Sequence, residues 1–203
     1  QKTVTTDATR PPPNPALAKI DDVPGLPRVL ILGDSISMGY TLPVRAALVG
    51  RANVHRAPEN CSSTSHGLSR IERWLGDGKW DVIHFNFGLH DAKLPPEGVR
   101  HAAPEAYEQN LRKLVQRLRT TGARLVWATT TPVPFGGILA PDRRFGDIAI
   151  YNGVAGRVMK ENGVAVNDLN AVIAPHLERY ARPRDLHFTT EGSALLAKHV
   201  VRS

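Results

Sequence analysis

Short aliphatic runs alternate with helical patterns from residue 28 to the end of this 203-residue chain. The first run, Val29-Leu30-Ile31-Leu32, is short and aliphatic, which is typical of a strand buried on both faces. Because strand and helix follow each other along the chain, the strands should lie parallel, with helices on both sides of their sheet. We therefore predict an α/β fold with a mainly parallel five-stranded sheet.

The expected elements can be placed from these patterns. Helical periodicity is clearest where Leu111, Leu114 and Leu118 recur on one face. The predicted strands cover residues 28–33, 52–57, 80–87, 123–130 and 163–167. The predicted helices cover residues 37–49, 66–76, 104–121, 145–162, 169–181 and 190–202.

Residues 1–27 differ in character from the rest of the chain. Pro11-Pro12-Pro13-Asn14-Pro15 is typical of polyproline conformation. We interpret residues 1–27 as an extended Pro-rich N-terminal arm, although a floppy terminus explains this composition at least as well. Leu17 and Ile20 are the side chains of this arm that can pack on the domain.

Charge and cysteine content exclude some classes of protein. The formal net charge is +7, but the basic residues are scattered without an aromatic-interleaved stripe, so we expect no nucleic-acid partner. A positive surface can favour an anionic polysaccharide or an anionic membrane face, and solubility alone explains it equally well. No apolar run approaches the roughly 20 residues of a transmembrane segment. Cys61 is the single cysteine, so no internal disulfide forms, and the cysteine count does not indicate in which cellular compartment the protein works.

The chain begins at Gln1 rather than at Met. A removed signal peptide explains this start, and so does a boundary introduced by cloning. On the first interpretation we expect a secreted or periplasmic protein.

Gly33-Asp34-Ser35 stands between the first predicted strand and the helix that follows it. A serine at this turn has its hydroxyl at the carboxyl edge of the sheet, where an α/β protein can hold a nucleophile. Taken alone, such a turn is most often only a helix cap, because Asp and Ser begin helices routinely. Ser62, His90 and the loop after Thr129 also follow predicted strands, so they should reach the same edge.

A serine hydroxyl becomes nucleophilic only when a base accepts its proton, and the base needs a partner that fixes its tautomer. Asp185 and His187 lie two residues apart in a predicted loop before the last helix, which Thr189 or Thr190 can cap. From a turn, the carboxylate can reach one ring nitrogen and leave the other facing Ser35. Histidine, with an unperturbed pKa of about 6.5, can accept and return a proton near neutral pH. Without Ser35, the pair would be interpreted as a solvated loop.

The two segments together, Gly33-Asp34-Ser35 and Asp185-Leu186-His187, resemble the first and last sequence blocks of the SGNH (GDSL-type) hydrolase superfamily. This resemblance implies a three-layer αβα sandwich, an SGNH/flavodoxin-like fold, with residues 28–203 as the catalytic domain. It also implies that the serine is the nucleophile, the histidine the base and the aspartate the orienting acid.

The spacing of the last block departs from the family pattern, which has two residues between the acid and the histidine. Only Leu186 intervenes here, and Arg184 occupies the usual position of the acid. Either Asp185 acts from a shifted loop, or the acid comes from elsewhere in the chain. We prefer Asp185.

The resemblance further implies an oxyanion hole formed by Ser35, Ser62 and His90. The family uses the backbone N–H of the nucleophile, the N–H of a second-block glycine and the asparagine of a Gly-x-Asn-Asp block. In Gly88-Leu89-His90-Asp91 a histidine replaces that asparagine, and its neutral ring N–H can donate in the same way. Ser62 replaces the glycine, and Asn86 is a second candidate amide donor.

Further side chains near this edge are candidates for substrate contact. Some follow the first three strands, and others lie in the long connection from Thr130 to Gly146, a length that is often functional. The Arg pair in that connection is as well explained by solvation. The candidates are Asp34, Asn60, Asn86, Phe135, Arg143 and Arg144.

We predict neither a metal site nor a cofactor. His84, His90 and Asp91 lie close in the sequence but lack the spacing of zinc ligands. No Gly-rich phosphate loop is present.

The sequence thus predicts a serine hydrolase that forms an acyl-serine intermediate, with a carbohydrate acetylesterase acting on small-molecule or carbohydrate esters as the preferred reading. Two alternatives stay open: a lipase or thioesterase of the same superfamily acting on longer acyl chains, and a non-catalytic carbohydrate-binding relative. The missing glycine and the replaced asparagine favour the last of these, whereas the Ser35, Asp185 and His187 set argues against it.

Overall fold

The computed structural model describes residues 13–94, 102–140 and 143–203, with only the backbone described at Phe135, Ala140 and Arg143. Within this part of the chain, five parallel strands form a central sheet in the order β2-β1-β3-β5-β8. This is the flavodoxin-like order, which confirms the predicted sheet. The strands are β1 (Arg28–Leu32), β2 (Asn53–Arg56), β3 (Val82–Phe85), β5 (Arg124–Ala128) and β8 (Ala165–Asn167).

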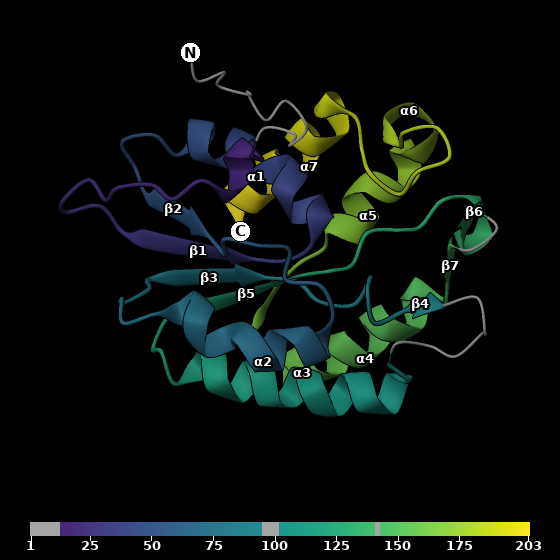
Figure 1. Cartoon of the computed structure of the whole chain (residues 1–203), viewed down its shortest axis with the longest axis horizontal. Coiled ribbons are helices and arrows are strands. Elements are labelled where there is room, and N and C mark those ends of the chain that lie inside the picture. Colours follow the sequence, from purple (N-terminus) through teal and green to yellow (C-terminus); the bar gives the residue numbers. More distant parts are fainter. Residues whose placement is uncertain (1–12, 95–101, 141–142) are drawn as a thin grey trace, which may run out of the picture.

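Helices cover both faces of the sheet, as the alternation of elements requires (Figure 1). The three-layer αβα sandwich is thereby confirmed. The strand order reverses between β1 and β3, and sheets of this kind bind ligands at the carboxyl ends of such neighbours. One face carries α2 (Thr64–Leu75), α3 (Pro104–Arg119) and α4 (Ile148–Glu161), and the other carries α1 (Ser35–Ala47), α5 (Leu169–Ile173) and α7 (Thr190–Arg202).

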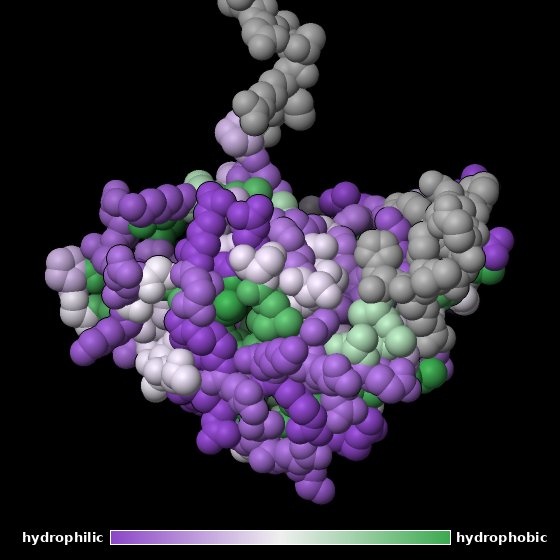
Figure 2. All heavy atoms as spheres, turned by 60° about the horizontal axis from the view of Figure 1, so that its bottom comes forward, coloured by the Kyte–Doolittle hydropathy of each residue, from purple (hydrophilic) through white to green (hydrophobic). Residues whose placement is uncertain are grey.

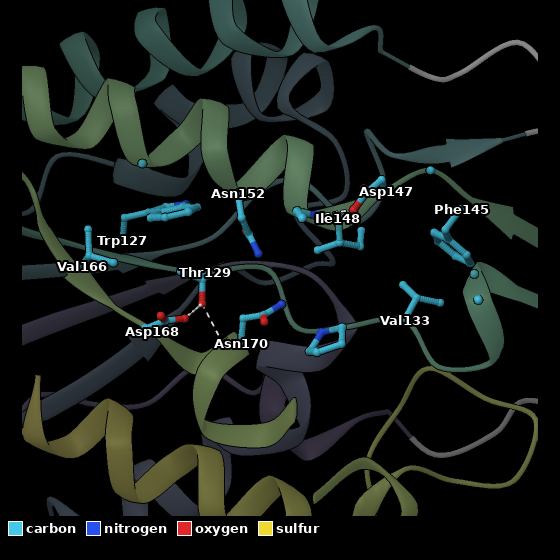
Figure 3. A pocket seen from close by; sticks show the side chains of 16 residues that line it. Trp127, Thr129, Val133, Phe145, Asp147, Ile148, Asn152, Val166, Asp168 and Asn170 are labelled. Carbon is cyan, nitrogen blue, oxygen red and sulfur yellow. Dashed lines mark hydrogen bonds between the residues drawn. The ribbon is translucent and has the colours of Figure 1, made fainter. Parts of the chain in front are cut away.

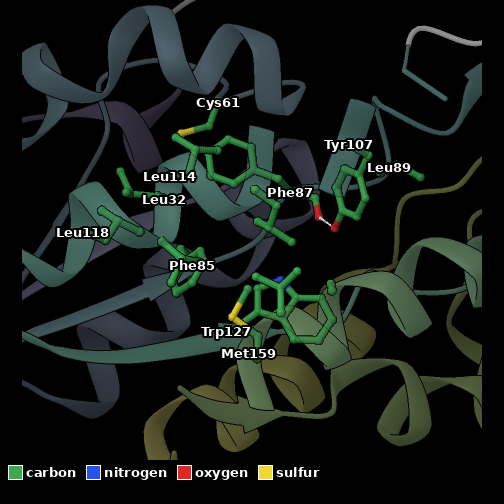
Figure 4. Packing of buried hydrophobic residues seen from close by; sticks show 14 of the residues in the cluster. Leu32, Cys61, Phe85, Phe87, Leu89, Tyr107, Leu114, Leu118, Trp127 and Met159 are labelled. Carbon is green, nitrogen blue, oxygen red and sulfur yellow. Dashed lines mark hydrogen bonds between the residues drawn. The ribbon is translucent and has the colours of Figure 1, made fainter. Parts of the chain in front are cut away.

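Two apolar cores result, one between the sheet and each helical layer. Successive strand residues point to opposite faces, so Leu30 and Leu32 enter the core of α2, α3 and α4, whereas Ile31 enters that of α1, α5 and α7. In the first core, Trp127 is almost fully buried, and the buried Tyr107 hydroxyl donates to the backbone oxygen of Phe87 (Figure 4). Each fully buried large apolar side chain contributes about 1.5–3 kcal/mol to folding.

The connections after β3 and β5 together form a feature that the sequence did not predict. Three short strands, β4 (Lys93–Leu94), β6 (Ile138–Ala140) and β7 (Arg143–Phe145), form an antiparallel sheet in the order β4-β7-β6. The prediction of helix from residue 145 was therefore wrong at its start: the helix begins at Ile148, and the Asp147 side chain caps it by accepting from the Ala149 N–H.

The predicted helix over residues 169–181 is broken. It consists of α5, a 3-10 turn η3 (Ala174–His176) and α6 (Leu177–Tyr180). Pro175 lies in the middle turn, where its ring and its missing N–H interrupt an α-helix.

The segment that precedes β1 lies against the domain. Its 3-10 turn η1 (Pro15–Leu17) buries Ala16, and the Arg45 side chain of α1 donates to the backbone oxygens of Pro15 and Ala18. Farther along, the Asn53 side-chain amide bonds to the backbone of Val23 and Leu26.

The face of the molecule shown in Figure 2 is mostly hydrophilic, with apolar side chains in small groups. Of the helices that the structure describes, none combines the length and the apolar character needed to cross a bilayer.

Candidate active site

Ser35 is the first residue of α1, directly after the β1 turn. Asp34 caps this helix, because its buried carboxylate accepts a hydrogen bond from the Ile36 N–H (2.9 Å). N–H groups in the first turn of a helix have no partner within the helix, so the Ser35 N–H is available as a donor. Asp34 therefore supports the turn, and its exposure of only 4% argues against the substrate contact predicted for it.

Arg56, at the end of β2, fixes the turn between β1 and Ser35. Its buried guanidinium donates to the backbone oxygens of Gly33 (2.9 Å) and Asp34 (3.3 Å) and to Ser37 Oγ (2.9 Å). Because a trans peptide is planar, fixing the Asp34 carbonyl directs the Ser35 N–H to the opposite side, away from Arg56. The sequence analysis missed this residue, although a charged side chain inside a predicted buried strand was a usable signal.

His187 connects Ser35 to Asp185. Its Nε2 lies 2.8 Å from Ser35 Oγ, and its Nδ1 lies 2.9 and 3.0 Å from the two carboxylate oxygens of Asp185. An ionised carboxylate only accepts hydrogen bonds, so Nδ1 carries the proton and Nε2 of the neutral ring accepts from the Ser35 hydroxyl. The structure thus brings together the three residues proposed as nucleophile, base and acid.

Burial raises the pKa of Asp185, but hydrogen bonds from His187 and from the Leu186 N–H outweigh it, so the net pKa lies below the usual value. The carboxylate stays ionised and keeps the histidine ring oriented.

A small hairpin explains how Asp185 acts with one residue fewer in the block. Ala181 and Phe188 pair as an antiparallel bridge, and the Arg182 N–H donates to the His187 backbone oxygen (2.9 Å). At the tip, Arg184 has a positive φ of 53°, a conformation unusual for a residue with a Cβ. This tight turn brings the Asp185 carboxylate within hydrogen-bond distance of His187 Nδ1. The departure in spacing is therefore accommodated by the loop.

The end of the hairpin is fixed to α7. Thr189 caps the helix, with its hydroxyl accepting from the Gly192 N–H, as one of the two predicted caps. A Cβ at Gly192 would lie 2.8 Å from the Tyr180 Cβ and 3.0 Å from the Phe188 Cβ, so the close approach of helix and hairpin requires glycine here.

His90 and Ser62 lie together beside this set. Ser62 Oγ is 3.3 Å from His90 Nδ1, and His90 lines the same hollow as Ser35 and His187. The loop that carries His90 begins at Gly88, where φ is +149° and a Cβ would lie 2.5 Å from Thr130 Oγ1. Ser62 occupies the expected glycine position with a φ of +53°. Its N–H donates to Asn60 Oδ1 (2.9 Å), so an oxyanion must compete with Asn60 for this group.

Other predicted contacts lie elsewhere. The Asn86 amide is buried and donates to the Ala128 oxygen and Thr130 Oγ1, which argues against the prediction of Asn86 as an oxyanion donor or substrate contact. Arg144 is exposed on β7. The side chains of Phe135 and Arg143 lie outside the described residues.

Two hollows flank the Ser35–His187 pair. One, of about 270 Å³, is lined largely by apolar side chains, including Leu89, Phe145 and Leu186, with Lys93 at its rim. The other, of about 380 Å³, is more polar and includes Met38, Arg182 and Ser193. The sequence analysis assigned none of these residues to a substrate pocket, because they belong to loops and helix faces that meet only in the folded chain. Across the described residues, no three His, Cys, Asp or Glu side chains cluster as metal ligands would.

A serine, a histidine and a carboxylate hydrogen-bonded in series at the carboxyl edge of a parallel sheet define an SGNH-type hydrolase site. Residues 31–195 match the model of the GDSL-like lipase/acylhydrolase family, and the chain belongs to this family. An arylesterase from Vibrio mimicus is 26% identical over 110 residues, covering 49% of this chain and 52% of that protein. The chain thus spans about half the length of this curated relative.

Solved structures show the same fold. The lipase/acylhydrolase from Enterococcus faecalis has a TM-score of 0.74 at 22% identity, over 87% of this chain and 94% of that chain. The acetyl xylan esterase AlAXEase has a TM-score of 0.70 at 17% identity, over 85% and 97%. A mutant of Axe2, an acetylxylan esterase from Geobacillus stearothermophilus, has a TM-score of 0.66 at 18% identity, over 87% and 93%. At these identities the likeness concerns the fold alone.

Proposed function

We propose that this protein is a serine esterase that cleaves short acyl groups, acetyl above all, from carbohydrates. The observation that carries the esterase activity is the unbroken chain of hydrogen bonds from Asp185 through His187 to Ser35. Its 2.8 Å contact between Nε2 and Oγ lies within the range needed for proton transfer.

The reaction follows from this geometry. His187 Nε2 accepts the Ser35 proton as Oγ attacks the ester carbonyl carbon, and a tetrahedral oxyanion forms. Collapse of this intermediate breaks the bond to the alcohol oxygen, which takes the proton from His187. Water then attacks the acyl-serine, giving its proton to His187, and the carboxylic acid leaves as Ser35 regains its hydrogen.

The developing oxyanion needs preorganised donors, each worth roughly 3–4 kcal/mol. The Ser35 N–H, directed by the Arg56 contact with the preceding carbonyl, is the first proposed donor. The His90 ring, held beside Ser62, is the second. The Ser62 N–H is a third donor only when its hydrogen bond to Asn60 Oδ1 is broken.

Two observations support a short acyl group on a carbohydrate. The apolar hollow at Ser35 has about 270 Å³, just below the range of about 300–1,000 Å³ typical of ligand pockets. Two of the similar folds belong to acetyl xylan esterases. Arg182 and Lys93, one in each hollow, favour an acidic group close to the ester, in keeping with the proposed anionic polysaccharide.

The test compares hydrolysis of p-nitrophenyl acetate, butyrate and octanoate by the wild type and Ser35→Ala, with acetate release from acetylated polysaccharides measured in parallel. Ser35→Ala should abolish turnover without unfolding the protein, and Ser69→Ala, at an exposed position of α2, is the matched control. Ser35-dependent cleavage confined to acetate supports the proposal. Rates that rise with chain length would instead indicate a lipase or thioesterase. No Ser35-dependent cleavage of any ester would refute the esterase and leave a carbohydrate-binding relative.

A further inference from the structure

A larger cleft lies beside the Ser35 hollow, between α4 and the segment after β8. Its volume is about 780 Å³, within the range of sites that hold a whole ligand. From α4, Asn152 points toward Thr129 and Asn170 on the opposite wall, and Phe145 and Val133 lie at one end (Figure 3).

Phe145 connects this cleft to the catalytic site. It is half-buried on β7 and lines both the 270 Å³ hollow that contains Ser35 and the 780 Å³ cleft. Neighbouring strands lie about 4.8 Å apart, so the β5 and β8 ends of the cleft are about 10–15 Å from β1, which carries Ser35. A ligand with several rings can therefore occupy both at once.

The cleft wall carries hydrogen-bonding groups with fixed positions. The Asn152 side chain accepts from the Thr130 N–H and donates to the Thr130 oxygen, and Asn170 Nδ2 donates to the same oxygen. Both amides are thereby oriented, and amide and carboxylate oxygens keep lone pairs for further donors. Asp147 and Asp168 contribute the carboxylates.

These groups distinguish between possible ligands. An acyl chain would remove water from two carboxylates and two amides without replacing their hydrogen bonds, which is unfavourable. Among the lining residues that the structure describes there is no Lys, Arg or His, so a polyanion would meet the carboxylates of Asp147 and Asp168 there without a compensating cation. A neutral sugar chain offers hydroxyl donors to the oxygens and C–H faces to Phe145 and the half-exposed Val166.

We infer that the cleft between α4 and α5 binds uncharged sugar units of the substrate, next to the unit whose ester is cleaved at Ser35. This assignment rests on the proposed function only for the position of the ester, because binding to the cleft itself does not require turnover.

Gly156 of α4 offers a way to fill the cleft. It lines the cleft, and a Cβ built there meets nothing within 4 Å, so a larger side chain enters open space. Gly153 on the same helix is exposed, does not line the cleft and also has open space at its Cβ. Gly156→Trp and Gly153→Trp therefore form a matched pair with the same effect on helix propensity.

The first measurement is the affinity of neutral oligosaccharides of increasing length for Ser35→Ala, alone and combined with each Trp substitution, by calorimetry. Affinity should rise with length in Ser35→Ala and in the Gly153→Trp combination. The Gly156→Trp combination should bind the longer sugars about tenfold or more weakly. Equal affinities in the two combinations would overturn the inference.

The second measurement uses the active enzyme. Gly156→Trp should lower kcat/KM for acetylated oligosaccharides about tenfold while leaving p-nitrophenyl acetate hydrolysis within about twofold of the wild type. Loss of octanoate hydrolysis instead would show that the cleft holds an acyl chain. A Gly156→Trp substitution that weakens binding of uronic-acid oligomers more than binding of neutral ones would show an anionic ligand in the cleft, and either result overturns the inference. Failure of the proposed esterase is recognised separately, since it removes p-nitrophenyl acetate hydrolysis from the wild type too.

Discussion

Ser62→Gly should stabilise this protein, because Ser62 adopts the backbone conformation of the glycine it replaces. Its φ is +53°, and a residue with a Cβ in the left-handed region costs roughly 1–2 kcal/mol. Glycine removes this cost but adds flexibility to the unfolded chain, worth about 0.5–1 kcal/mol. The net gain is therefore about 0.5–1 kcal/mol. In a chain of this size, 1 kcal/mol shifts Tm by about 2–4 °C, so a rise of about 1–4 °C is expected.

The side chain needs a separate control. Ser62 Oγ lies 3.3 Å from His90 Nδ1, and its loss also removes that contact. Ser62→Ala removes the hydroxyl but keeps the Cβ, so the difference between the Gly and Ala variants isolates the backbone. Calorimetric melts should show the Gly variant above the Ala variant, and Arg184, with the same φ, should give the same order. If Ser62→Gly is no more stable than Ser62→Ala, the strain at this position is refuted.

Four further predictions concern the site. Asp185→Asn should lower kcat about 10⁴-fold, because an amide no longer imposes the reactive tautomer of His187. Folding lowers the pKa of Asp185 from 3.8, so the wild type should lose stability relative to Asp185→Asn as the pH drops below 3.8, which melts from pH 5 to 2 will show. His90→Asn should retain substantial esterase activity, whereas His90→Ala should lose about a hundredfold, and equal kcat for His90→Ala and wild type would remove His90 from the oxyanion hole. Burial raises the pKa of Cys61 to about 12, so iodoacetamide at pH 8 should modify it only in urea, as mass spectrometry will show. Arg56→Lys should lower kcat for p-nitrophenyl acetate with little change in KM, since an ammonium lacks the planar fork; a parallel loss of Tm and activity without that split would indicate a purely structural role.

The fold could be predicted from the sequence because its signals are local and repeated. β1 is an aliphatic run, a helix lies between each sheet strand and the next, and parallel pairing is the arrangement this alternation permits. The small sheet β4-β7-β6 could not be predicted in this way. Its strands have two or three residues, too few for any periodicity, and β4 pairs with β7 from Lys93 to Phe145 and from Leu94 to Arg144, far apart in the sequence.

The site residues also differ in whether the sequence could predict them. Ser35, Asp185 and His187 could be proposed because the two segments that contain them occur together, one after the first strand and one before the last helix. The structural role of Asn86 could not be predicted, since the sequence does not reveal that a buried amide beside β5 donates to the Ala128 oxygen. That Asp185 could reach the histidine depended on a positive φ at Arg184, which no propensity of arginine predicts.

The loops that carry the site are held by buried charged groups from neighbouring loops. Arg56, from β2, holds the turn of Ser35, while the buried Asp91 carboxylate, from the loop of His90, accepts from the Thr64 N–H and hydroxyl at the start of α2. Each of these charges costs stability to bury, and helix-terminal N–H groups and backbone oxygens compensate for that cost in part. Apolar residues in their place could pack as well, but they could not direct a backbone N–H. Donors that are already aligned need no reorganisation when the oxyanion forms. The buried charges therefore lower the stability of the fold but preorganise the site for catalysis.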